Sequence, residues 1–204
     1  MFPPLKFHSM RSPLLTVFVV TFALTAGTIH AGEPGQISFE RDVMQVISKS
    51  GCNLGTCHGN KFGKGGFKLS LRGDRPWQDF ETLTRTFRGR RVNPLNPESS
   101  LLLLKPTMQV PHQGGRRFRE TDPEYQILRD WIAAGLPDDP EDLPALVNLK
   151  VAPKEVLLRD PEDSFQISVE AEFADGTTRD VTRLAVYEPA MPIVSIAPDG
   201  HDRH

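Results

Sequence analysis

The apolar residues of this chain follow two different repeats, and the repeat changes once along the sequence. Up to about residue 140 the regular stretches repeat every three to four residues, as in helices. FQISVEAEF (165–173) instead alternates apolar and polar residues, as a half-buried strand does. The change falls at the acidic, proline-rich DDPEDLP (138–144). We therefore expect a mainly α domain at 33–138, a linker at 139–145 and an all-β domain at 146–204.

Three segments of the first half have the apolar spacing of helices: 38–51, 77–87 and 121–135. Ser38 is a candidate N-cap of the first, and Gly51 ends it. Thr121 and Glu124 have the spacing of a capping box at the start of the last. The intervening Pro-, Gly- and Arg-rich segment predicts a loop with one helical turn at 97–104.

The second half carries strand signals in four segments: 146–153, 165–173, 183–189 and 193–200. Asp175-Gly176 predicts a hairpin turn after the second of them. This pattern is typical of a small antiparallel sandwich. Because only four or five strands can be drawn, a sandwich here would leave an unpaired edge, and we expect it to be incomplete.

The first 31 residues have the features of a secretory signal peptide. Lys6 and Arg11 precede the apolar, uncharged run 13–27, and Ala31 is a small residue at a plausible cleavage point. A run of about 15 residues is short of the roughly 20 needed to span a bilayer. We expect export to the periplasm or cell surface, with no stable membrane span after cleavage.

The charge balance excludes one class of partner. The chain has 24 basic and 26 acidic side chains and a formal net charge of −2. Nucleic-acid-binding proteins usually carry a basic excess, so we expect no nucleic acid partner.

The only two cysteines, Cys52 and Cys57, lie close together, and His58 directly follows the second. Two cysteines followed by histidine mark covalent haem attachment, but two residues normally separate the cysteines and here there are four. The histidine must lie rigidly beside one cysteine, and Cys57-His58 meets this demand. Cys52 has only to reach the second vinyl group, and a longer loop costs little entropy.

Other interpretations of this motif remain open. A Cys52–Cys57 disulfide suits an oxidising compartment, although it leaves His58 without a role. A zinc site needs two further ligands, and His112 is the only well-placed internal histidine. The stretch GNKFGKGG (59–66) has the composition of a phosphate loop, but it lacks the Walker spacing.

A haem iron has a second axial position, and KPTMQVPHQGGRRF (105–118) offers two ligands for it. Met108 and His112 are both candidates on the residue types alone. Arg116 and Arg117 follow, and guanidinium groups suit the haem propionates. The alternative for the two arginines is an ordinary solvated basic turn.

A resemblance to known proteins covers roughly residues 37 to 137. The cytochrome c-like domain of large exported proteins of planctomycete-type bacteria is similar to four stretches: FERDVMQVISKSGCNLGTCHG, GFKLSLRG, ESSLLLLKPTMQVPHQGGRRF and DPEYQILRDWIAAGLP. The resemblance implies one covalent haem c between a helix that leads into the haem motif and a last helix that crosses it. It matches His112 to a family histidine and favours it over Met108. Gln113 stands where a glycine is typical.

The stretch from Asn148 to Pro189, with FADGTTRDVT at 173–182 as its most recognisable part, resembles a group 2 bacterial Ig-like domain. This resemblance implies a spacer or adhesion module that contacts the cell surface or a polysaccharide. Family members are longer at their C-terminal end, in agreement with the incomplete sandwich.

These observations predict an exported electron-transfer protein with one haem c, held by Cys52 and Cys57, with His58 and His112 on the iron. If both axial positions are filled, no site remains for substrate, so we expect an electron carrier and not an enzyme, or the haem subunit of a larger oxidoreductase. Its redox partner protein is not indicated. The rival hypothesis is a non-haem surface protein with a Cys52–Cys57 disulfide and the Ig-like domain as its binding module.

Overall fold

Helices and strands together make up less than half of the described chain. A computed structural model describes residues 36–157, 164–190, 195–197 and 199–203. Helical residues are 28% of these and strand residues 13%. The expected fold class, a mainly α domain followed by an all-β sandwich, is therefore wrong. The predicted signal peptide, 1–31, lies outside the described residues.

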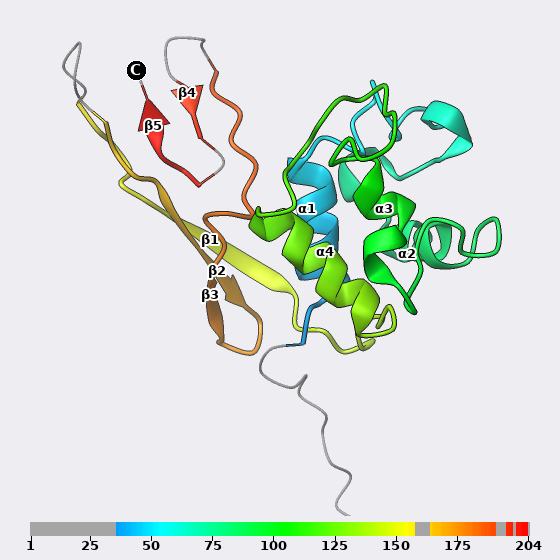
Figure 1. Cartoon of the computed structure of the whole chain (residues 1–204). Helices are drawn as coiled ribbons and strands as arrows, with labels where there is room; N and C mark the ends of the chain where they lie inside the picture. Colours follow the sequence, from blue (N-terminus) through cyan, green and yellow to red (C-terminus); the bar gives the residue numbers. More distant parts are fainter. Residues whose placement is uncertain (1–35, 158–163, 191–194, 198, 204) are drawn as a thin grey trace, which may run out of the picture. The chain divides into compact units, whose positions relative to one another are not determined.

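The helical elements are short and come before the strands (Figure 1): η1 (Phe39–Val43), α1 (Met44–Lys49), η2 (Lys64–Gly66), η3 (Leu71–Gly73), α2 (Pro76–Thr84), η4 (Pro97–Ser99), α3 (Leu101–Leu104) and α4 (Pro123–Ala133). The first is a π-helical turn that runs on into α1, and η2 to η4 are 3₁₀ turns. Loops rich in Gly and Pro separate them, because these residues interrupt the helical repeat. None of the helices in the described ranges is long and apolar enough to cross a bilayer.

The helix ends agree with the predictions at Ser38 and Gly135, whereas α2 ends at Thr84 and not at residue 87 as predicted. The Ser38 hydroxyl accepts a hydrogen bond from the Arg41 backbone N–H at 3.0 Å, as expected of an N-cap. Gly135 follows the last helix at φ 88°, a left-handed conformation that ends helices. The N-cap of α4 is Asp122 and not Thr121, so the predicted capping box is wrong by one residue.

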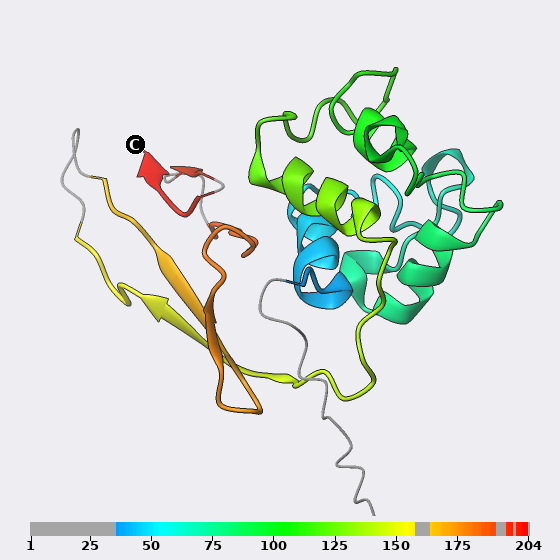
Figure 2. The ribbon, with the colours of Figure 1, turned by 60° about the horizontal axis from the view of Figure 1, so that its bottom comes forward.

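Three aromatic side chains form the centre of the helical core. Phe39, Phe80 and Trp131 come from η1, α2 and α4, and their ring centroids lie 5.1 to 6.4 Å apart. The indole N–H of Trp131 donates to the Pro137 carbonyl at 2.9 Å. Figures 1 and 2 both show α4 beside α1, which leads directly into the two cysteines. This packing anchors the start of the cysteine loop.

Asp79 is buried beside Ser70 and should make stability depend on pH. Its carboxylate accepts hydrogen bonds from the Ser70 backbone N–H at 2.6 Å and from the Ser70 hydroxyl, yet burial raises its pKa above the ordinary value. The folded state therefore holds the Asp79 proton more tightly than the unfolded chain, so this contribution to stability is lost as pH rises above about 4. We expect Asp79→Asn to gain stability relative to wild type between pH 4 and pH 7, measured by urea unfolding. A difference between the two proteins that does not change with pH would contradict this.

The strands are antiparallel and few: β1 (Leu146–Ala152), β2 (Ser168–Phe173), β3 (Thr178–Asp180), β4 (Ser195–Ile196) and β5 (Asp202–Arg203). The first three form one sheet in the order β1-β2-β3, and the last two pair with each other. The hairpin predicted at Asp175-Gly176 is confirmed, with Gly176 at φ 80° between β2 and β3. The strand predicted at 183–189 is wrong, because the described chain makes a turn and then an irregular segment there.

The expected Ig-like sandwich is not formed by the described residues, and burial gives the reason. A sandwich packs two sheets face to face, whereas every residue of β1 is exposed. Leu184, placed by prediction in a strand, lies in the turn and joins the cluster of buried apolar residues that the helices form. Leu184, with the partly buried Val181, thus packs on the helical cluster and not on a second sheet.

Candidate functional site

The loop that carries the two cysteines is closed by its own backbone hydrogen bonds. The His58 N–H donates to the Cys52 carbonyl at 2.9 Å, and the Cys57 N–H donates to the Leu54 carbonyl at 2.9 Å. The four residues between Cys52 and Cys57 therefore form a turn. Gly59 allows the backbone to close on itself, since a Cβ there would lie only 2.0 Å from the Asn53 carbonyl oxygen.

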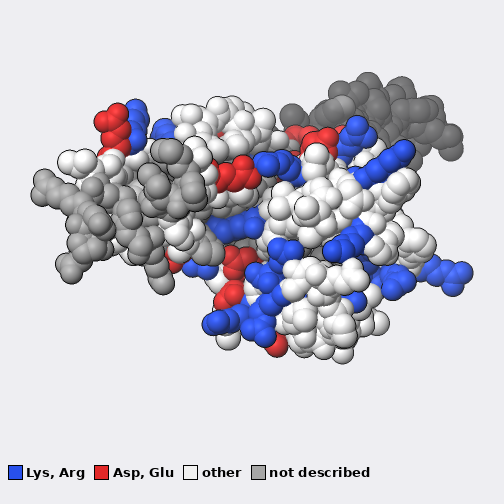
Figure 3. All heavy atoms as spheres, turned by 90° about the horizontal axis from the view of Figure 1, so that it is seen from above, with Lys and Arg blue, Asp and Glu red and all other residues white. Residues whose placement is uncertain are grey.

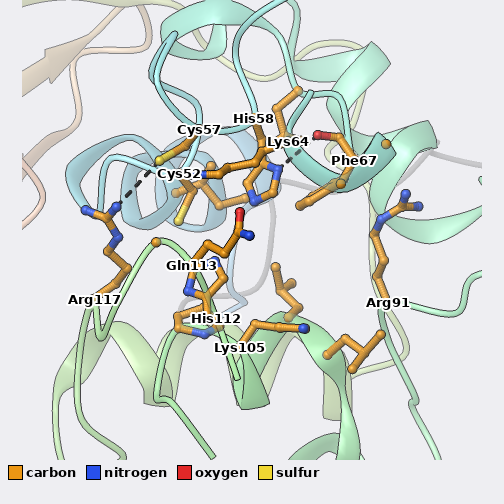
Figure 4. A pocket seen from close by; sticks show the side chains of 18 of the residues that line it. Cys52, Cys57, His58, Lys64, Phe67, Arg91, Lys105, His112, Gln113 and Arg117 are labelled. Carbon is orange, nitrogen blue, oxygen red and sulfur yellow. Dashed lines mark hydrogen bonds between the residues drawn. The ribbon is translucent and has the colours of Figure 1, made fainter. Parts of the chain in front are cut away.

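A cavity of about 520 Å³ lies beside this loop, within the size range of cofactor pockets. Its walls come from the cysteine loop, from residues 64–69, from residues 87–91, and from α3 with the loop that follows it. Figure 4 shows these side chains directed into one space. The segment after His58, expected to cover the haem motif, contributes Phe67 and Leu69 to the wall.

His58 presents one nitrogen to the cavity as a possible ligand. Its Nδ1 lies 3.0 Å from the Phe67 carbonyl oxygen. Because a carbonyl only accepts, Nδ1 carries the proton and Nε2 carries the lone pair. Burial lowers the pKa of His58, and the hydrogen bond to Phe67 opposes this. A neutral imidazole whose other nitrogen donates to a carbonyl is the usual arrangement of a metal-bound histidine.

His112, on the opposite wall of the cavity, is also hydrogen-bonded through Nδ1 to a backbone carbonyl. Its Nδ1 lies 2.9 Å from the Gly115 carbonyl oxygen, so in the neutral ring Nε2 again carries the lone pair. Gly114 packs against the ring, and a Cβ at this position would lie 2.7 Å from His112 Cε1. The His58 and His112 ring centroids are 6.5 Å apart, and the ring planes differ by 12°. Two histidines 54 positions apart in sequence thus share one pocket with matching tautomers.

Gln113 also lines the cavity and points into it from the same loop (Figure 4). Its side chain is exposed to solvent. A flat ligand between the imidazoles would require Gln113 to rotate outward, which an exposed, unbranched side chain does at low cost.

Both cysteines are free thiols, and both line the cavity. Burial raises the pKa of Cys52 to about 11, against the opposing charge of Arg117, so this thiol is protonated at neutral pH. Arg117 lies close to the second thiol, with Nη2 3.5 Å from Cys57 Sγ.

The structure brings most of the predicted site residues together. Cys52, Cys57, His58, His112 and Arg117 line the cavity. Met108 and Arg116 are exposed, and neither is among the residues that line this cavity.

Sequence reasoning missed four further cations that line the cavity: Lys64, Arg90, Arg91 and Lys105. The only signal for Arg90 and Arg91 was the basic run RGRR (88–91), which does not distinguish a surface loop from a pocket wall.

Within the described ranges, no three or more His, Cys, Asp or Glu side chains are grouped so that they could hold a metal ion. A haem iron takes four ligands from the porphyrin, so two protein ligands suffice for it. No family model, curated protein or solved structure matches this chain.

Proposed function

We propose that this chain is an exported haem protein that transfers electrons, with haem c bound covalently in the cavity between His58 and His112. The observation that carries the proposal is the pair of near-parallel imidazoles, 6.5 Å apart across a cavity that both cysteines line. Two imidazoles on opposite sides of one metal ion, each at a metal–nitrogen distance of about 2 Å, have ring centroids about 6 Å apart.

The thiols supply the covalent part of the proposal. Each of Cys52 and Cys57 would add across one vinyl group, forming a carbon–sulfur bond while the thiol hydrogen moves to the neighbouring vinyl carbon. This addition needs no oxidant and no leaving group. Two free thiols, with Cys52 kept protonated by burial, support it, whereas the rival hypothesis requires a disulfide.

When bound, haem supplies an iron that accepts and returns one electron. The protein would hold the iron with two imidazoles, fix their orientation through the Phe67 and Gly115 carbonyls, and set the polarity around it. With both axial positions filled, no position is open to a substrate. We therefore propose a carrier, and the strands from residue 146 onward as an accessory segment.

The test is expression with an export signal and a haem c maturation system, followed by denaturing electrophoresis and a haem stain. We expect a stained band for the wild type, and an absorbance spectrum of six-coordinate haem. Cys52→Ala with Cys57→Ala should abolish the stain, because no thioether can form. A wild-type protein without retained haem, but with a Cys52–Cys57 disulfide by mass spectrometry, would refute the proposal and favour the surface-protein alternative.

A further inference from the structure

The charge of the cavity walls is one-sided. Among the described residues, no Asp or Glu lines the cavity, whereas five cationic side chains do: Lys64, Arg90, Arg91, Lys105 and Arg117. The chain as a whole has a formal net charge of −2, so this is a local excess of positive charge. Figure 3 shows groups of Lys and Arg side chains on the face seen from above. A pocket of this kind favours a ligand with negative charge.

Arg91 is the buried member of this set. Its side chain is only 8% exposed, and Nη1 donates to the Thr82 and Thr86 carbonyls at 2.9 and 3.2 Å. Its guanidinium carbon lies 4.5 Å from the Phe67 ring centroid and 5.5 Å from that of Phe87.

Among the described residues, no carboxylate lies within salt-bridge distance of Arg91. A buried guanidinium usually has an acidic partner, because burying an unpaired charge is costly. Arg91 is thus held in the cavity wall by its carbonyl and ring contacts, and the described residues supply no carboxylate to pair with its charge.

The position of Arg91 says which end of the cavity would receive such an anion. Cys52, Cys57 and Arg117 lie at one end in Figure 4, and Arg91 lies at the other, beyond the two imidazoles. Haem has its vinyl groups toward one edge and its two propionate carboxylates at another edge, away from them. With the vinyl groups at the thiols, the propionates are directed away from Arg117.

We propose that Arg91 is the residue that positions the haem by binding a propionate carboxylate, an inference that rests on the proposed function. Arg117, next to Cys57 Sγ, then lies at the thioether end. The fork of the guanidinium suits a carboxylate, and the two carbonyls and two rings keep its orientation fixed before the ligand arrives.

The test compares haem with its dimethyl ester, in which both carboxylates are neutral. In the full chain with Cys52→Ala and Cys57→Ala, porphyrin would be held by the imidazoles alone, so its equilibrium affinity can be titrated by absorbance. We expect the ester to bind about ten- to a hundredfold more weakly than haem, the effect of losing a charge-assisted hydrogen bond. Adding Arg91→Gln should reduce this ratio to about threefold or less, and Arg91→Lys should retain part of it.

Arg85→Gln is the matched control, because Arg85 is exposed and pairs with Glu81 on the surface. It should leave the ratio unchanged. Equal affinity for haem and its ester in the chain that retains Arg91 would overturn the proposed role of Arg91 but not the haem site. This outcome does not depend on whether Arg91→Gln folds. Binding of neither porphyrin would overturn the role of Arg91 and non-covalent binding by the two imidazoles, whereas the covalent site stands or falls by the haem stain of the wild type.

Discussion

Replacing His112 by alanine should convert the haem-loaded protein from one that excludes carbon monoxide to one that binds one molecule per haem. His112 is the imidazole across the cavity from His58, and in the proposed haem site its removal would open an axial position. The reduced spectrum should shift from a six-coordinate to a five-coordinate form, with the haem still retained on a denaturing gel through the cysteines. Absorbance spectra of the reduced protein, with and without carbon monoxide, measure both effects.

Met108 and Gly114 provide the controls for this result. Met108→Leu should leave the spectrum unchanged, because Met108 is exposed and does not line the cavity. Gly114→Ala should act in the same direction as His112→Ala, since its Cβ would displace the imidazole, whereas Gly55→Ala meets no atom within 4 Å and should have no effect. A spectral change in Met108→Leu but not in His112→Ala would exchange the two residues' roles.

Truncating Trp131 to alanine should lower the free energy of unfolding by about 3–5 kcal/mol, a large fraction of the stability of a domain of this size. Trp131 is fully buried between Phe39 and Phe80. Its removal leaves a cavity and also leaves the Pro137 carbonyl without its hydrogen bond. Urea unfolding followed by circular dichroism measures the change.

Trp77 is the matched control in the same protein, because the chain has only these two tryptophans. Its side chain is 69% exposed near the start of α2, so Trp77→Ala should change stability by less than about 0.5 kcal/mol. Similar losses for the two variants would mean that the core does not have the arrangement described above.

Local signals in the sequence predicted local structure well. Ser38 and Gly135 mark helix ends because side-chain caps and left-handed glycines depend on a few neighbouring residues. Asp175-Gly176 marks its hairpin for the same reason. The segment around Leu184 was predicted as a strand and is a turn. An alternating pattern does not reveal whether an apolar side chain packs on a sheet or on a helix.

The prediction of the fold class was wrong for a related reason. Periodicity identifies which elements are possible, but not how much of the chain they occupy or what covers their faces. Here the loops between the short helices contain more residues than the helices do, and the described residues place no second sheet over the exposed β1.

The sequence identified those candidate site residues whose type and spacing alone indicate haem or metal binding. Cys52, Cys57 and His58 were found from spacing, and His112 was favoured by resemblance. Arg91 could not be proposed from the sequence, because the argument for it rests on its burial against Phe67 with no acidic partner among the described residues, which only the packed structure reveals.

The closed turn between Cys52 and Cys57 has a consequence for assembly. The His58 backbone N–H already donates to the Cys52 carbonyl, so folding alone orders the backbone that carries both thiols and the His58 imidazole. If haem binds as proposed, the conformational entropy of ordering this loop would be lost before the haem arrives and would not weaken its binding. The two extra residues would then preorganise the site and not loosen it.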